Sequence, residues 1–269
     1  MKQLSKKISN STLAVNINGT IPTATVGEYR NAIYPVSKDE KTGVRVSKWG
    51  SFKIVRGGVT PRHRDVMDAI ITKCMKSQYV RNSITGEDEI HLLYDAKEVL
   101  EFLNTTSTYS WLKGMLLDLQ ATVITIERKD GSWPDSWNLL SFNGDSKIDA
   151  VREPWQKQAK LKKIVLSPGT VKWMQQDIKI FVNEEVVNQV MLLKNQVSKS
   201  VARWFLSHAN GQNHPIESVL EAVGCKIDAK EIKRRASQLE EDRDGLHALG
   251  ISLGNNINSR RIGGVWFEN

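Results

Sequence analysis

The order of helical and strand-like patterns limits the fold of this chain more than any other feature. Between residues 60 and 142 the order is helix, strand, helix, helix, strand, turn, strand. Thr60 and Pro61 are typical of a helix start. Apolar residues then recur at helical spacing through Val66, Ile70 and Cys74. A first helix is therefore predicted from residue 61 onward, and Cys74 is expected to belong to it.

Two more helices are predicted after a short strand at 89–95. Asp95 can cap the first of them, which we expect to bury Val99, Phe102 and Leu103. The second covers 105–120 and has an apolar face, made of Leu112, Met115, Leu116 and Leu119. Residues 122–129 and 137–142 then predict a hairpin around a turn with the sequence DGSWPDS.

The same order returns near the C-terminal end. The stretch VSKSVARWFLSHAN predicts a helix whose inward residues are Val197, Val201, Trp204, Phe205 and Ala209. A short helix is predicted from Pro215 to Gly224, and Asp228 can cap the next one. Residues 249–268 predict two short strands around a turn rich in Asn and Gly. The strand between the first two helices is shortened or missing in this second copy.

This order is that of a winged helix, in which two adjacent helices form a helix-turn-helix and the hairpin forms the wing. We therefore predict an α+β chain with two tandem winged-helix domains, at 45–182 and 183–269. Residues 1–44 mix Lys, Ser, Thr and Asn with scattered apolar residues and are interpreted as a flexible N-terminal arm. Strands are also predicted within 44–58, 163–167 and 178–186, and the last two are expected to return to the first domain.

The charge balance points to a polyanionic partner. The chain has 38 Lys and Arg against 30 Asp and Glu, a net charge of +8. Excess positive charge favours nucleic acid through counterion release, although many soluble proteins are mildly basic. Cys74 and Cys225 are far apart, as expected in a reducing cytoplasm. No apolar run is long enough for a membrane span, and no signal peptide is recognisable.

Catalytic motifs are not found in the sequence. There is no phosphate-binding Gly-x-x-x-x-Gly-Lys-[Ser/Thr] loop, no paired histidine motif and no Gly-x-Ser-x-Gly. Glu87, Asp88 and Glu89 stand beside Gly86 and are interpreted as a solvated turn rather than a metal site. We therefore expect no enzymatic activity, no cofactor and no bound metal.

In the second domain, the helix after Asp228 carries the main candidates for DNA binding. Its apolar stripe is predicted to face the core through Ile232, Ala236, Leu239 and Leu246. The opposite face then presents four candidate contacts, Lys230, Lys233, Arg234 and Ser237. Cations near a helix N-terminus oppose the helix dipole, so an anionic partner explains them better than helix stability does.

An alternative is a solvated face that the following acidic block, Glu240, Glu241 and Asp242, neutralises. Arg260 and Arg261 are predicted to lie in the second wing and to contact phosphate.

The first domain offers weaker candidates. Ser107, Thr108, Tyr109 and Lys113 begin its second helix of the helix-turn-helix and are placed to contact DNA, or else cap and pack the helix. Arg128 and Lys129 are predicted at the wing, where basic residues contact phosphate or are simply exposed. Trp133 and Trp137 follow nearby and stack on a base or pack inside the domain.

From Val44 to its end, the chain resembles a family of plasmid replication initiators. Three stretches carry the resemblance, namely LEFLNTTSTYSWLKGMLLDLQATVITI, IKIFVNEEVVNQV and SVARWFLSHANGQNHPIESVLEAVGC. They are similar to the TrfA-type initiators, relatives of the iteron-binding Rep proteins with tandem winged helices. In that family the recognition helix corresponds by position to residues 230–237 here.

The resemblance implies a bacterial initiator that acts on plasmid DNA in the cytoplasm. It would bind direct repeats (iterons) in double-stranded origin DNA, help to open the adjacent AT-rich DNA and recruit host DnaA and the replicative helicase. An equilibrium between monomer and homodimer would control plasmid copy number. Two alternatives stay open, because fold does not settle function. One is a transcriptional regulator or partition protein that binds an operator, and the other is a module for protein interaction.

Overall fold

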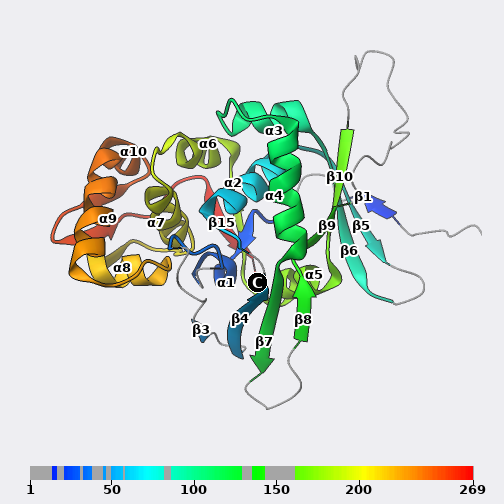
Figure 1. Cartoon of the computed structure of the whole chain (residues 1–269), viewed down its shortest axis with the longest axis horizontal. Coiled ribbons are helices and arrows are strands. Elements are labelled where there is room, and N and C mark those ends of the chain that lie inside the picture. The colour runs from blue at the N-terminus through cyan, green and yellow to red at the C-terminus, as the bar shows by residue number, and fades with distance from the viewer. Residues whose placement is uncertain are drawn as a thin grey trace, which may run out of the picture.

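The computed structural model describes residues 14–16, 21–30, 33–37, 45–46, 50–56, 58–81, 86–128, 135–142 and 161–268. Helices and strands are mixed along the chain, so the α+β class is confirmed. Buried side chains form two separate apolar cores. Helices α6 to α10 gather around the second core on one side of the molecule, and a five-stranded sheet lies on the other side (Figure 1).

The first core lies between three helices and a five-stranded antiparallel sheet. The helices are α2 (Pro61–Thr72), α3 (Ala96–Phe102) and α4 (Tyr109–Ala121). The sheet has the order β1 (Ala14–Asn16), β5 (Cys74–Arg81), β6 (Asp88–Asp95), β10 (Leu161–Leu166), β9 (Leu140–Phe142). The predicted apolar face of α4 is confirmed, because Leu112, Met115, Leu116 and Leu119 are all buried. Val99 is buried as predicted, whereas Phe102 and Leu103 are only partly buried.

Strand β5 was not predicted, and it corrects the expected end of the first helix. Helix α2 ends at Thr72, and Cys74 begins a strand whose partner in register is Tyr94 of β6. The spacing of apolar residues within 61–77 is compatible with a helix that continues beyond Thr72. The backbone groups of β6 offer a sheet partner, and this pairing decides the conformation instead.

The hairpin predicted for the first domain is present only in part. Leu140–Phe142, which were expected in its second strand, form β9 of the five-stranded sheet, and the remaining hairpin belongs to a separate sheet. Strands β7 (Val123–Arg128) and β8 (Asp135–Asn138) pair with each other. They join β3 (Arg45–Val46) and β4 (Gly50–Arg56) in the order β3-β4-β7-β8. Strand β6, which precedes the two helices in the chain, pairs with β5 and β10 instead. Helix α5 (Pro168–Gln176) packs against β8 and β6.

The second core is enclosed by α6 (Glu184–Leu192), α7 (Gln196–Leu206), α8 (Ile216–Ala222), α9 (Ala229–Glu241) and α10 (Arg243–Ala248). Four inward residues of α7 are buried as predicted, Val197, Val201, Trp204 and Phe205. Ala209 lies beyond the end of the helix and is exposed, so its predicted burial is wrong.

The strand interpreted as shortened or missing is present as β12 (Gln212–Pro215). It pairs with β14 (Asn256–Ser259), which also pairs with β13 (Ile251–Leu253), giving the order β12-β14-β13. Residues 212–215 have no alternation of apolar and polar side chains. Their extended conformation rests on the backbone pairing with β14, which no local pattern reveals.

A fourth sheet joins distant parts of the chain. Its order is β15 (Val265–Glu268), β11 (Lys179–Val182), β2 (Ala24–Thr25). Strand β11 was expected to return to the first domain, but Ile180 lies in the second core. The expected boundary after residue 182 therefore separates β11 from the core that it helps to build.

Part of the N-terminal arm is packed rather than flexible. Residues 21–30 and 33–37, called the strap below, contain β2 and the short helix α1 (Val26–Arg30). Ala24 and Tyr29 belong to the second core, and Ile33 and Tyr34 belong to the first. The strap thus contacts both cores, which corrects the prediction of a flexible arm for these residues. Residues 1–13 of the arm lie outside the described residues.

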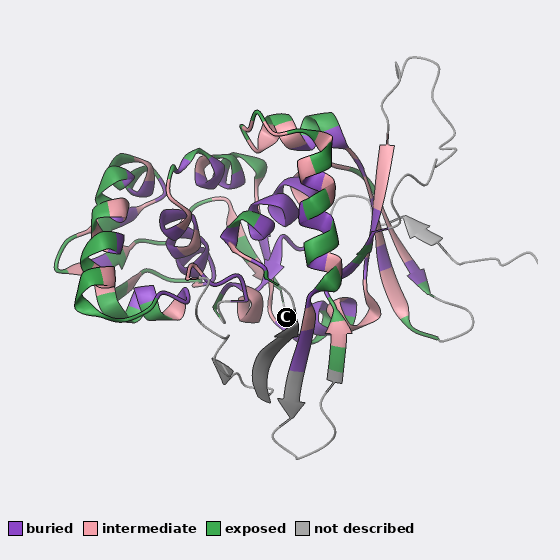
Figure 2. Cartoon of the chain, viewed as in Figure 1, coloured by how far each residue is buried: buried purple, intermediate pink, exposed green. Residues whose placement is uncertain are grey.

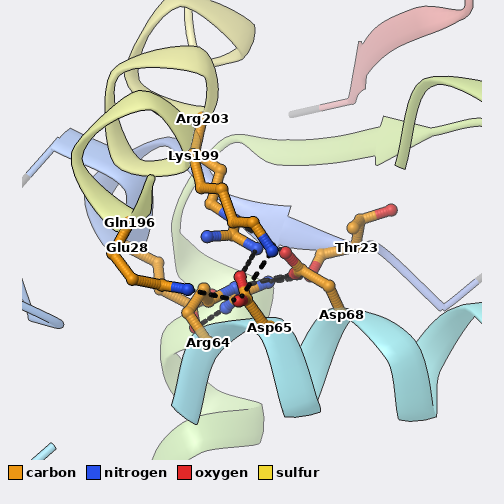
Figure 3. Close-up of polar contacts among 8 residues, drawn as sticks. All are labelled: Thr23, Glu28, Arg64, Asp65, Asp68, Gln196, Lys199 and Arg203. Carbon is orange, nitrogen blue, oxygen red and sulfur yellow. Dashed lines mark hydrogen bonds and ion pairs between the residues drawn. The ribbon is translucent and has the colours of Figure 1, made fainter. Parts of the chain in front are cut away.

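The two cores meet at a buried network of charges between α2 and α7 (Figure 3). Arg203 Nη2 donates to Asp65 Oδ1 at 2.5 Å, and its Nε donates to Asp68 Oδ2 at 2.7 Å. Arg64 Nε donates to the other oxygen of Asp68 at 2.7 Å, and Arg64 also pairs with Glu28 of the strap. Helices α2 and α7 are buried along most of their length (Figure 2).

No helix within the described ranges combines the length and apolar character that a membrane crossing requires.

Candidate nucleic-acid interface

Helix α9 presents a basic face away from the second core. The Asp228 carboxylate accepts the backbone N–H of Glu231 at 2.8 Å and so caps the helix, as predicted. Toward the core, Leu239 is buried and Ile232 packs at the edge of the apolar cluster. The four candidate contact residues are exposed on the outward side, and they are Lys230, Lys233, Arg234 and Ser237.

The charges on this face differ in how far they are already neutralised. Glu231 accepts Arg234 Nε at 2.9 Å and Arg235 Nε at 2.8 Å. The hydrogen bond from Arg234 lowers the pKa of Glu231 below its usual range, so the carboxylate stays ionised. Lys230 and Lys233 have no ion-pair partner within the described part of the chain. They are therefore the cations most available to an external anion.

The acidic block does not neutralise this basic face. Asp242 is buried where α9 ends, and its carboxylate accepts the backbone N–H groups of Lys194 at 2.8 Å and Asn195 at 2.9 Å. These hydrogen bonds lower the pKa of Asp242 although burial opposes them. Glu240 pairs with Arg243 at 2.7 Å. The alternative of a solvated face that the acidic block neutralises does not hold for Asp242, because this residue holds the start of α7 instead.

Arg260 and Arg261, which were predicted to lie in a wing, lie beside the hairpin of β13 and β14 rather than on its strands or tip. The hairpin of β13 and β14 turns at residues 254–255, whereas both arginines follow the last residue of β14. The Arg260 N–H donates to the carbonyl of Gly250 at 3.1 Å, at the end of the hairpin away from the turn. Both residues are exposed. The predicted position in the wing is corrected to its base.

One exposed cation near the start of α9 was not among the predicted contacts. Lys226 lies in the turn between α8 and α9, and its Nζ is 3.7 Å from the carboxylate of Asp228. Its backbone N–H donates to Ser37 Oγ of the strap at 3.3 Å. In the sequence, its position two residues before the predicted cap, Asp228, could have indicated Lys226 as a contact residue.

At the start of α4, the predicted contact residues have local structural roles. Thr108 accepts the Trp111 N–H at 3.4 Å and caps α4, and the Ser107 N–H donates to Thr105 Oγ1 at 3.1 Å. Tyr109 packs against the first core, with the ammonium of Lys162 4.6 Å from its ring centroid. The capping and packing interpretation therefore describes these residues in this structure.

The outward face of α4 is not basic. Its exposed residues are Ser110, Gly114, Leu117, Asp118 and Ala121, and Lys113 is half-buried. Leu117 is 48% exposed, which makes this face partly apolar.

The remaining candidates of the first domain lie at its hairpin. Arg128 is the last residue of β7, but its side chain lies outside the described residues, as do Lys129 and Trp133. Trp137 packs edge-on against Trp173, with ring centroids 6.2 Å apart, which favours its packing role.

Within the described ranges, no three His, Cys, Asp or Glu side chains gather closely enough to hold a metal ion. Comparisons with protein-family models, curated proteins and solved structures gave no match.

Proposed function

We propose that this chain is a non-enzymatic plasmid replication initiator that binds repeated sites in double-stranded origin DNA. The observation that carries the proposal is the outward basic face at the start of α9, with Lys230 and Lys233 unpaired among the described residues. In a helix-turn-helix, the N-terminal part of the second helix enters the major groove and its cations contact phosphate. Helix α9 holds that position after α8.

A tandem winged-helix arrangement is the second part of the proposal. The second domain supports it through the order α7, β12, α8, α9, α10, β13, β14, in which α10 is an additional short helix, and through the strand order β12-β14-β13. The first domain supports it through the order α2, β5, β6, α3, α4, β7, β8, although β5 is an additional strand and the hairpin of β7 and β8 joins another sheet. We assign DNA reading to the second domain, because the exposed residues of α4 carry no positive charge.

The partly apolar face of α4 suits a protein contact better than a DNA contact. We propose that the first domain takes part in the equilibrium between monomer and homodimer. Contacts with host DnaA and the replicative helicase, opening of AT-rich DNA and action on a plasmid in the bacterial cytoplasm follow from the resemblance to TrfA-type initiators.

Replacement of the two unpaired lysines tests the role of α9. We expect Lys230→Gln/Lys233→Gln to weaken DNA binding and to reduce the slope of log K against log salt by roughly 0.9 for each lost phosphate contact. The matched control, Lys76→Gln/Lys97→Gln, removes the same charge from exposed positions of the first domain. An unchanged slope in the α9 variant would show that this helix does not contact phosphate.

Footprinting on the DNA that flanks the gene separates the candidate functions. An initiator is expected to protect several evenly spaced direct repeats beside an AT-rich segment. Protection of one palindrome, on DNA that does not support plasmid replication, would favour the regulator or partition protein instead.

A further inference from the structure

A cavity of about 260 Å³ lies where the two domains meet, apart from the outward face of α9. Its walls come from α2, from the turn between α3 and α4 and from the first turn of α4. The other walls are the end of α6, the start of α7 and the segment that joins these two helices. All of its lining residues belong to described segments. At the roughly 30 Å³ that a water occupies in the liquid, this volume accommodates a hydrated phosphate or a small phosphate ester.

Cations exceed acids around this cavity. Arg62, Lys194 and Lys199 line it, and Asp65 is the acidic residue among its lining residues. Arg62 and Lys194 are exposed and have no ion-pair partner within the described part of the chain. The Arg62 guanidinium lies 5.6 Å from the ring centroid of Trp111, a contact that leaves its N–H groups able to donate.

Asp65 does not balance Arg62 and Lys194, because its carboxylate is already shared by residues of α7. It accepts Arg203 Nη2 at 2.5 Å, Lys199 Nζ at 3.2 Å and Gln196 Nε2 at 3.2 Å. Figure 3 shows the side chains from α7 converging on Asp65 of α2. The Lys199 side chain is only 9% exposed, and its ammonium keeps two further N–H donors beyond the bond to Asp65.

The buried polar atoms around the cavity are not all satisfied. Gln196 Oε1 is buried and accepts no hydrogen bond from the described residues. Burial lowers the pKa of Lys199, and the charges of Arg203 and Arg62 lower it further against the opposing effect of Asp65. A buried acceptor is normally satisfied by a donor or by ordered water.

We propose that this cavity binds a phosphate group, held by Arg62 of the first domain and by Lys194 and Lys199 of the second. Arg62 and Lys194 donate to the phosphate oxygens from opposite domains, and Lys199 supplies charge from within. Gln196 Oε1 accepts a hydrogen bond from a water molecule that hydrates the phosphate, or from a protonated phosphate oxygen. A phosphate bound here ties α2 to α7 and so couples occupancy of the cavity to the relative position of the domains.

The phosphate group could belong to the DNA backbone or to a free phosphorylated small molecule. Binding of backbone phosphate rests on the proposed function, whereas binding of a free phosphate compound does not. The test variant is Arg62→Gln/Lys194→Gln, which changes exposed residues outside the basic face of α9 and outside the buried charge network. Lys76→Gln/Lys97→Gln is the control of equal charge.

The first measurement is thermal unfolding with inorganic phosphate or ribose 5-phosphate, against sodium chloride at the same ionic strength. The second is the salt dependence of binding to the DNA protected in footprints. If the cavity takes backbone phosphate, the test variant reduces the salt slope by roughly 0.9 to 1.8, while the control does not. If it takes free phosphate, the ligands raise the Tm of the native protein and of the control but not of the test variant.

Either result supports the phosphate site and shows whether the phosphate comes from DNA or from a free small molecule. The proposal is overturned if phosphate ligands raise no Tm above the chloride reference and the DNA salt slope is unchanged in the test variant. Failure of the α9 variant to alter DNA binding would count against the proposed function alone. The phosphate titration would still decide whether the cavity binds an anion.

Discussion

At the residue scale, burial decides which polar side chains are available to a partner and which serve the fold. His208 and His214 illustrate this, because both rings pack against Trp204. The His208 ring centroid lies 4.3 Å from that of Trp204, and the His214 centroid lies 5.0 Å from it. His208 Nδ1 is 2.9 Å from the carbonyl oxygen of Trp204, at the end of α7. Burial, with a smaller effect from the charge of Arg30, lowers the pKa of His208 from 6.5 to about 4.

This shift predicts a loss of stability in acid. Between pH 6.5 and about 4 the unfolded chain binds a proton at His208 that the folded chain does not, so the free energy of unfolding falls as pH falls. We expect His208 to account for about 1 to 2 kcal/mol of that loss, after allowance for its partial exposure. Urea unfolding of the native protein and of His208→Asn at pH 7 and pH 4 measures it.

His247→Asn, at an exposed position of α10, is the control and should keep the full pH dependence of the native protein. Equal pH dependence in the native protein and His208→Asn would contradict the assignment.

At the element scale, the strap is the segment whose role departs most from its appearance in the sequence. Strand β2 extends β11, with Thr25 opposite Lys179 and Ala24 opposite Ile180. The Val26 N–H donates to the carbonyl of Ile178 at 2.9 Å, which continues this contact into α1. Tyr29 then inserts into the second core, under the Arg64 guanidinium at 5.0 Å from its ring centroid. A short element is therefore stable here through its tertiary contacts.

Tyr29→Ala should release the strap from β11. We expect a loss of about 3 kcal/mol in the free energy of unfolding, because a large buried ring is removed. Amide hydrogen exchange in β11 should become faster, since β2 would no longer cover that edge. Tyr29→Phe keeps the ring and is the matched control, with exchange in β11 near that of the native protein. Unchanged exchange in β11 of Tyr29→Ala would mean that β2 holds its place without Tyr29.

At the scale of the whole molecule, buried charges join the two cores in addition to the apolar side chains of the strap. Arg203 of α7 binds both Asp65 and Asp68 of α2, and all three side chains are at most 4% exposed. Glu28 extends the network to the strap through Arg64. Burying charges costs solvation free energy, which these pairs offset only while every partner is present. The relative position of the two cores thus depends on a complete set of ion pairs.

Arg203→Met is expected to destabilise the protein by about 3 to 5 kcal/mol, because it leaves two buried carboxylates short of a cation. A double-mutant cycle with Asp68→Leu should show clear coupling, since the second change removes one of those carboxylates. Urea unfolding of the four proteins gives the coupling free energy. The same cycle on the exposed pair of Lys97 and Glu101, 3.6 Å apart, is the control and should give coupling too small to measure. Additive effects in the buried cycle would show that these residues act independently.

The sequence by itself determined the features that depend on neighbouring residues. Asp95 and Asp228 cap the helices that they were expected to cap. Thr108, for which capping was one of two interpretations, caps α4, and the helix therefore begins at Tyr109 rather than at residue 105. The apolar face of α4 and the exposed basic face of α9 also follow from spacing alone, because helical periodicity places residues three and four apart on one side. The candidate interface of the second domain was therefore predictable in its residues, although its contact with DNA remains a proposal.

The tertiary structure alone decided how these elements are joined. Strand β12 exists because β14 pairs with it, and the hairpin of β7 and β8 joins β4 rather than β6. The charges of Asp242 and Arg203 were visible in the sequence, but their burial was not. The physical reason is that caps and periodicity act within a few residues, whereas sheet partners and buried ion pairs join residues far apart in the chain. Local patterns carry no record of which distant partner completes them.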